Sequence, residues 1–324
     1  MKKHEWTTAL GGKMKEFFEF KRLSGFKYEC EGRILERFDD YCAAKQFGKA
    51  VLTREIAECF VYGAYYEKPD TRYVKERLIR NFGKYLYERD GESYVCPQKF
   101  KPKKRGFTPY IFTESELYRF FQAVDQYPPH PLSNRHKIDP LLFRMLYGCG
   151  LRISEALHLR IDHVDTINGT LLILQAKNNK DRLVPMAESL RRRCEAFLQQ
   201  ALVPSSNEGF FFPSPLGGTF DKSTVYRRFR EYLWQAGISH SGHGPRIHDL
   251  RHTFCVHCLK RWVFSGKDIL NLMPYLSVYL GHADFRGTQY YLRLTADLYP
   301  DILSKEEAAL GCVFPERRAA NEDE

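Results

Sequence analysis

A basic run that contains proline divides this chain and limits what it can fold into. The run reads Lys99-Phe-Lys101-Pro-Lys103-Lys104-Arg105-Gly106. Proline lacks a backbone N–H and clashes inside a helix, so Pro97, Pro102 and Pro109 prevent a helix from continuing through this segment. We therefore expect residues 97–110 to form an extended linker between two domains.

The basic charge is concentrated before and within this linker. Residues 1–105 contain 24 Lys plus Arg against 16 Asp plus Glu, a net charge of +8, whereas residues 106–324 have a net charge of +2. A basic segment of this kind commonly follows a phosphate backbone, but a nuclear-import-like or merely solvated run has the same composition. On the DNA-binding interpretation, the contacting residues include those of the run and one hairpin lysine: Lys99, Lys101, Lys103, Lys104, Arg105 and Lys180.

The front of the chain is predicted to be a small helical bundle. Apolar residues recur three and four positions apart in four stretches, 14–23, 28–46, 53–66 and 71–89. Glycine and proline separate most of these stretches. We therefore predict that residues 1–96 form a basic helical domain that binds DNA.

The second domain is predicted to be mainly helical with one small antiparallel sheet. Thr113-Glu-Ser-Glu116 has the form of a capping box and begins this domain. The runs 170–175 and 182–185 are predicted to pair as a hairpin, with a turn at Asn178-Asn179 and with Lys177 and Lys180 at its tip. Further helices are predicted over residues 140–147, 151–157, 187–202, 222–236, 248–261 and 270–281, with Pro274 interrupting the last.

The sequence favours a protein without metal, cofactor or membrane span. The nine cysteines are an odd number, and the cluster His252, Cys255, His257 and Cys258 has no second ligand pair at zinc spacing. We find no phosphate-binding glycine loop and no two-metal carboxylate cluster. No stretch approaches the roughly 18 apolar residues that a transmembrane helix needs, so a cytoplasmic, nucleoid-associated protein is expected.

Four short motifs of the second domain are informative because of their order along the chain. They are Leu146-Tyr-Gly-Cys-Gly-Leu-Arg152-Ile-Ser-Glu155-Ala-Leu157, Ala176-Lys177 through Pro185, His248-Asp-Leu-Arg251-His-Thr-Phe254, and Leu280-Gly-His282-Ala-Asp followed by Tyr291. Each motif alone arises by chance in many proteins. Together and in this order they resemble the tyrosine recombinase, or phage integrase, family, tightly over residues 107–300. The basic N-terminal part of the chain resembles that family's core-binding domain only in general character, as a basic helical domain.

This resemblance implies a catalytic domain over residues 111–295 and a set of catalytic residues. Phosphodiester cleavage needs a nucleophile, charge stabilisation and a proton for the leaving oxygen. The residues implied are Arg152, Lys177, His248, Arg251, His282 and Tyr291. Two guanidinium groups can clamp one phosphate, although pairing with Glu155 or Asp249 is the structural alternative. His248 or His282 alone would be an ordinary core or capping histidine, and Lys177 a solvated turn residue.

Tyr291 is the expected nucleophile. Tyr290 and Tyr291 are adjacent, and a helix points adjacent side chains about 100° apart, so only one can face the phosphate. The family's spacing after Gly281-His282 favours Tyr291. A phosphotyrosyl bond conserves the energy of the broken backbone bond, so rejoining needs neither ATP nor a metal.

The resemblance thus implies a site-specific DNA recombinase that acts through a 3′-phosphotyrosyl intermediate on double-stranded DNA. Integration or excision of a mobile element is the expected setting, with a chromosome dimer resolvase as the alternative. Four protomers, identical or mixed with sister recombinases, are expected on paired sites. Residues 296–324 are expected to form a tail helix that, by the resemblance, docks on a neighbouring protomer, with packing on its own domain as the alternative. The segment 261–279, between the third and fourth motifs, is longer than in the commonest members of the resembled family. The alternatives are a type IB topoisomerase, a catalytically silent DNA-binding protein of the same fold and, more remotely, a metal nuclease.

Overall fold

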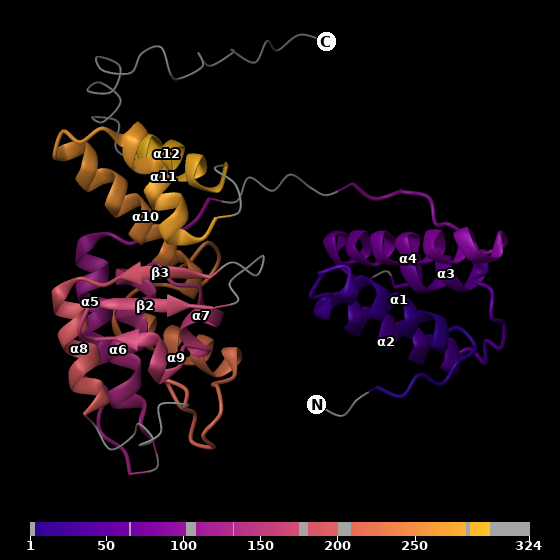
Figure 1. Ribbon diagram of the computed structural model, residues 1–324, viewed down its shortest axis with the longest axis horizontal. Coiled ribbons are helices and arrows are strands. Elements are labelled where there is room, and N and C mark those ends of the chain that lie inside the picture. The colour runs from indigo at the N-terminus through magenta and orange to yellow at the C-terminus, as the bar shows by residue number, and fades with distance from the viewer. Residues whose placement is uncertain are drawn as a thin grey trace, which may run out of the picture. The chain divides into compact units, whose positions relative to one another are not determined.

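The computed structural model describes residues 4–64, 66–101, 108–131, 133–174, 181–199, 209–282 and 286–298. The chain divides into two compact units, Met1–Phe107 and Thr108–Glu324, which Figure 1 shows. The predicted fold class, mainly helical with a small antiparallel sheet, is confirmed. Within the described ranges, no helix combines the length and the apolar character that crossing a bilayer requires.

The described residues of the first unit form a bundle of four helices: α1 (Gly11–Leu23), α2 (Glu29–Ala44), α3 (Arg54–Tyr62) and α4 (Pro69–Asp90). Local signals fix their ends. The Thr53 side chain accepts a hydrogen bond from the Ile56 N–H and so caps α3, and a proline occupies the first position of α4. The amphipathic faces meet in a core that contains the fully buried rings of Phe17, Phe38 and Phe82.

The segment that follows α4 packs against this bundle without forming a helix. The buried carboxylate of Glu76 accepts the backbone N–H groups of Lys99, at 2.7 Å, and Phe100, at 3.0 Å. Tyr62 donates its hydroxyl to the same carboxylate at 2.8 Å. These bonds hold the chain up to residue 100 on the first unit.

The second unit begins with α5 (Glu114–Asp125), whose capping box at Thr113 and Glu116 forms as the sequence predicts. Seven more helices of the described residues follow: α6 (Arg135–Gly148), α7 (Ile153–Leu157), α8 (Glu188–Leu198), α9 (Lys222–Gln235), α10 (Ile247–Phe264), α11 (Ile269–Leu280) and α12 (Arg286–Leu298). A short 3₁₀ helix, η1 (Ile161–His163), precedes the sheet. The main core of the unit contains the rings of Phe120, Phe143 and Phe229.

The sheet has three antiparallel strands in the order β1 (Val164–Asp165), β2 (Thr170–Ile173) and β3 (Arg182–Pro185). The hairpin of β2 and β3 is the predicted one, with Thr170 opposite Pro185 and Ile173 opposite Arg182. Strand β1 was not among the elements predicted from the sequence. A strand of two residues has too few alternating positions to be recognised from its pattern.

Helices α10, α11 and α12 pack together, and α11 also contacts β3 (Figure 1). The predicted interruption at Pro274 is wrong, because α11 continues through it. Ile269, Met273, Leu276 and Leu280 are all buried on one face of this helix. Their burial compensates for the backbone hydrogen bond that a proline removes. This layer of three helices carries most of the candidate site.

Candidate active site

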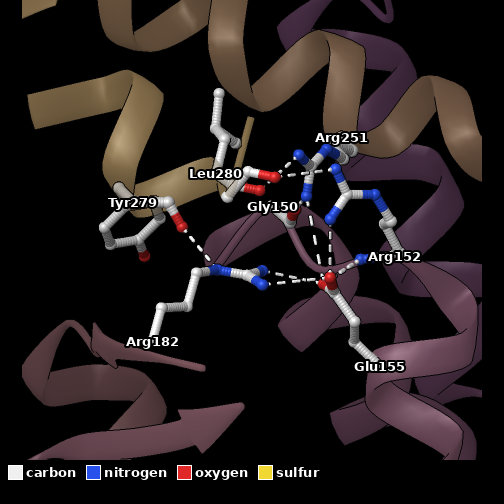
Figure 2. Close-up of polar contacts among 8 residues, drawn as sticks. Gly150, Arg152, Glu155, Arg182, Arg251, Tyr279 and Leu280 are labelled. Atoms are coloured by element: carbon white, nitrogen blue, oxygen red, sulfur yellow. Dashed lines mark hydrogen bonds and ion pairs between the residues drawn. The ribbon is translucent and has the colours of Figure 1, made fainter. Parts of the chain in front are cut away.

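A buried carboxylate, Glu155, organises one side of the site (Figure 2). It accepts a 2.7 Å bond from Nη1 of Arg152 and a bidentate pair from Arg182, at 3.0 and 2.8 Å. Burial raises the pKa of the Glu155 carboxyl, but the hydrogen bonds and charges of Arg182 and Arg152 outweigh it and hold that pKa at about 2. Glu155 is therefore ionised at neutral pH.

Arg251 approaches the same region from α10 and is almost fully buried. Its guanidinium donates to the carbonyl of Gly150 at 2.7 Å and to the carbonyl of Leu280 at 2.6 Å. Arg152, before α7, donates to the carbonyl of Gly281 at 3.2 Å. The guanidinium groups of Arg251 on α10 and of Arg152 before α7 thus converge on the C-terminal end of α11, where Figure 2 shows Leu280. The alternative pairing of Arg251 with Asp249 does not occur, whereas Arg152 does pair with Glu155.

Gly281 is the backbone position where these groups meet. It ends α11 with a φ of 64°, a left-handed conformation that glycine adopts without strain. A Cβ atom there would lie 3.0 Å from Nη1 of Arg182. Arg182 also donates from Nε to the carbonyl of Tyr279 at 2.9 Å, so β3 is fixed to the end of α11.

His248 and His252 lie one turn apart on α10, with their rings edge to face at a centroid distance of 4.7 Å. Burial lowers the pKa of each to about 4, and the positive charge of Arg251 adds to the effect. Both imidazoles are therefore neutral at pH 7. Each can accept a proton from a suitable donor.

Tyr291, on α12, is the tyrosine that faces this cluster. Its hydroxyl lies 2.8 Å from Nδ1 of His252, and its ring is stacked against His282 at 6.0 Å. Tyr291 is 4% exposed, whereas Tyr290 is 38% exposed, as helical spacing predicts. Burial raises the pKa of the Tyr291 hydroxyl, and the Arg251 guanidinium opposes this rise. Nδ1 of His282 lies 2.8 Å from the hydroxyl of the fully buried Thr288.

The structure thus brings together five of the six predicted catalytic residues: Arg152, His248, Arg251, His282 and Tyr291. The sixth, Lys177, lies outside the described residues, as do Lys180, Lys103, Lys104, Arg105 and the tail 299–324. Lys99 belongs to the first unit, with Nζ 3.6 Å from Glu58 and 4.3 Å from the ring centroid of Tyr62. Lys101 is exposed.

Two members of the site were missed by sequence reasoning. Arg182 was assigned only to a strand, and His252 only to a doubtful zinc cluster. The helical spacing of His248 and His252, four residues apart on one face, was the available signal for His252. Nothing near Arg182 in the sequence indicates its partner Glu155. Over the described ranges, no group of three or more His, Cys, Asp or Glu side chains is arranged to hold a metal ion.

Comparison with known sequences decides the family. The sequence pattern described as the phage integrase family matches residues 111–297. The chain belongs to that family. As a tyrosine recombinase, it is an enzyme of the class that cleaves and rejoins DNA strands, and the matched range contains all five of the assembled residues.

Full-length relatives are similar to this tyrosine recombinase. A chain described as the integrase/recombinase y4rB of Sinorhizobium fredii is 30% identical over 91% of this chain and 96% of its own length. The tyrosine recombinase XerD of Neisseria meningitidis is 31% identical over 83% and 86%. The tyrosine recombinase XerC of Oceanobacillus iheyensis is 29% identical over 86% and 88%.

Solved structures share the recombinase fold. The XerH recombinase bound to its difH substrate gives a TM-score of 0.58 at 20% identity, over 83% of this chain and 77% of that one. A lambda integrase dimer bound to a core site gives 0.57 at 14% identity, over 85% and 96%. At these identities the likeness concerns the fold.

Proposed function

We propose that this tyrosine recombinase cleaves and rejoins DNA at specific sites through a 3′-phosphotyrosyl intermediate, with Tyr291 as nucleophile. The observation that carries the proposal is the position of the Tyr291 hydroxyl, buried beside Arg251, His252 and His282. A tyrosine that only fills a core needs no such cluster of cationic and imidazole groups.

Arg152 and Arg251 bind the scissile phosphate in this mechanism. Their guanidinium groups converge on the end of α11 and present planar donors that match phosphate oxygens. Charge on those oxygens changes during phosphoryl transfer, so fixed donors stabilise the transition state. His248 and His282 complete the binding of the phosphate from α10 and from the turn after α11.

Lys177 protonates the 5′-oxygen as it leaves. This role follows from the resemblance and from the sequence position of Lys177, five residues before β3 begins at Arg182. A substrate with a bridging 5′-sulfur tests the role, because a thiolate leaves without a proton. Lys177→Ala should regain cleavage on that substrate, and failure to regain it would assign Lys177 to DNA positioning instead.

The decisive experiment traps the covalent intermediate. A DNA duplex nicked next to the cleavage site releases a short fragment, so the enzyme stays attached. In the presence of a metal chelator, we expect the wild-type protein and Tyr290→Phe to form the adduct. Tyr291→Phe should form none, although its DNA affinity should be unchanged. An adduct from Tyr291→Phe but not from Tyr290→Phe would assign the nucleophile to Tyr290, and no adduct from the wild type would support a silent DNA-binding protein.

Strand exchange between two sites then separates a recombinase from a type IB topoisomerase, which relaxes DNA as a monomer. We propose that four protomers act on paired sites and that residues 296–324 dock on a neighbouring protomer. Deletion of residues 308–324 should preserve binding to a single site and reduce assembly on paired sites. A full-size, active complex of the truncated protein in sedimentation would contradict the tail proposal.

We propose integration or excision of a mobile element as the setting, since a transposon integrase, that of Tn1549, shares the fold with a TM-score of 0.58.

We also propose that residues 1–96 and the linker 97–110 follow the DNA backbone. Each phosphate contact that is lost flattens the slope of log affinity against log salt by about 0.9. Replacement of Lys101, Lys103, Lys104 and Arg105 with Ala should flatten that slope by about 3 to 4 without changing sequence preference. An unchanged slope would show that the linker stays solvated when DNA is bound.

A further inference from the structure

The immediate partner of the Tyr291 hydroxyl is His252, which no part of the proposed mechanism has yet used. The hydroxyl oxygen lies 2.8 Å from Nδ1 of His252, and the two ring centroids are 5.4 Å apart. Tyr291 is 4% exposed and His252 is 9% exposed, so water has little access to this hydrogen bond. The contact joins α10 to α12, two helices that pack directly on each other.

The surroundings of His252 suit a neutral imidazole that accepts through Nδ1. Its other nitrogen, Nε2, lies 4.0 Å from a carboxylate oxygen of Asp249, which favours the proton on Nε2. His248 packs against it edge to face on the same helix. Burial, the charges of Arg246 and Arg251 and the nearby His282 lower the pKa of His252 in the protein without DNA, so the imidazolium form is disfavoured.

We propose that His252 is a further catalytic residue, the general base that accepts the Tyr291 hydroxyl proton during attack and returns it when the strand is resealed. This inference rests on the proposed function. During cleavage the Tyr291 oxygen bonds to phosphorus, the bond from phosphorus to the 5′-oxygen breaks, and the phenolic proton moves to Nδ1 of His252. The leaving 5′-oxygen receives its proton separately, from Lys177 in the mechanism above.

Geometry favours His252 over His248 for this step. The Tyr291 hydroxyl has a hydrogen-bonding distance to His252, whereas His248 reaches the cluster through its ring contact with His252. This division leaves His248 to contact the phosphate. A bound phosphodiester would also place a negative charge beside Arg251, and a nearby anion raises the basicity of an imidazole.

The test compares His252→Asn with a matched variant on the same helix. The amide oxygen of Asn takes about the place of the imidazole Nδ1, so it can still accept the hydrogen bond from the Tyr291 hydroxyl. It is not basic enough to take the proton. His257, also on α10, offers the control, because its Nδ1 lies 3.0 Å from the hydroxyl of Tyr147 on α6 in a second histidine–tyrosine pair. Single-turnover cleavage of the nicked duplex is measured from pH 5.5 to 9, with DNA affinity measured for each protein.

We expect His252→Asn to slow cleavage by about 100-fold or more near pH 7, as loss of a general base commonly does. Its remaining rate should rise about tenfold per pH unit, because hydroxide must then remove the proton, while the wild-type rate is flat between pH 7 and 9. His257→Asn should match the wild type. Equal rates for His252→Asn and wild type, or the steep pH dependence in His248→Asn instead, would overturn the inference.

A measurement on the wild-type protein keeps the inference falsifiable if His252→Asn does not fold. The ¹⁵N chemical shifts of the imidazole should show His252 with its proton on Nε2 and an acceptor Nδ1 that shifts in Tyr291→Phe, while His257 stays unchanged. A proton on Nδ1 would contradict the inference. Absence of wild-type adduct contradicts the proposed function, whereas wild-type cleavage with an unimpaired His252→Asn contradicts only the role of His252.

Discussion

Among its described residues, the second unit contains two clusters of arginine and carboxylate, each centred on a buried carboxylate, and they differ in charge balance. The Arg135 cluster consists of Arg135, Asp139, Arg228, Glu231 and Tyr232. The Glu155 cluster consists of Arg152, Glu155, Arg182 and Arg251. The first sets two cations against two carboxylates, whereas the second sets three cations against one carboxylate.

This difference separates a structural role from a functional one. In the Arg135 cluster, Arg135 reaches Asp139 at 3.2 Å and Glu231 at 2.7 Å, and Arg228 reaches Asp139 at 3.0 Å. Each charge there has an opposite charge within the fold. An excess of buried positive charge is costly, so its retention in the Glu155 cluster points to an anion that arrives from outside. A phosphodiester is such an anion.

The largest expected effect comes from unbalancing the Arg135 cluster. Arg135→Met should lower the free energy of unfolding by about 3 kcal/mol or more, because removal of one partner leaves a buried carboxylate less compensated. Urea unfolding measures this loss. Cleavage by the folded fraction should stay at the wild-type rate, and a variant that is stable but inactive would break the comparison.

Loss of activity without a large loss of stability is expected for Arg152, which is the most exposed of the three arginines in the Glu155 cluster. Arg152→Ala should slow cleavage by about 100-fold, equivalent to about 3 kcal/mol of transition-state stabilisation. Its free energy of unfolding should fall much less than that of Arg135→Met, because Arg182 still pairs with Glu155. Single-turnover cleavage and urea unfolding of the same preparation give both quantities, and equal losses in stability would erase the distinction.

A smaller effect is expected in acid. The folded-state pKa of Glu155 is lowered to about 2, below that of the unfolded chain, so its ionisation stabilises the fold at pH values above about 4.5. This stabilisation is lost as the pH falls toward 2, with about 1 kcal/mol gone by pH 3.5. Urea unfolding of the wild type and Glu155→Gln between pH 3.5 and 7 checks the sign. The difference between the two proteins should shrink toward low pH, and a constant difference would contradict it.

Sequence reasoning predicted the helices and strands better than the side-chain contacts between them. The capping box at Thr113 and the β2–β3 hairpin depend on neighbouring residues, so local patterns predict them. The interruption at Pro274 was wrong because tertiary burial of one helix face outweighs a local signal. Helical geometry indicated that only one of Tyr290 and Tyr291 can face the site, the spacing in the resembled family favoured Tyr291, and the exposures of the two rings agree with that choice.

The candidate site was predicted as a set of residues, without its internal bonds. The bond from Arg182 to Glu155 spans 27 positions and the bond from His252 to Tyr291 spans 39, and no periodicity encodes either. An arginine that begins a short strand is usually exposed, so nothing in the sequence marks Arg182 as buried. Such contacts follow only once the strands and helices are placed in space.

The crowding at Gly281 sets how freely that position can change in evolution or in a library. Gly266, just after α10, has the same φ of 64°, yet a Cβ there would meet nothing within 4 Å. Asparagine tolerates this backbone conformation, so a library randomised at position 266 should retain asparagine beside glycine. At position 281 a side chain would displace Arg182, and glycine alone should survive selection for recombination. One backbone angle thus permits substitution at one helix end and forbids it at the other, according to what stands next to it.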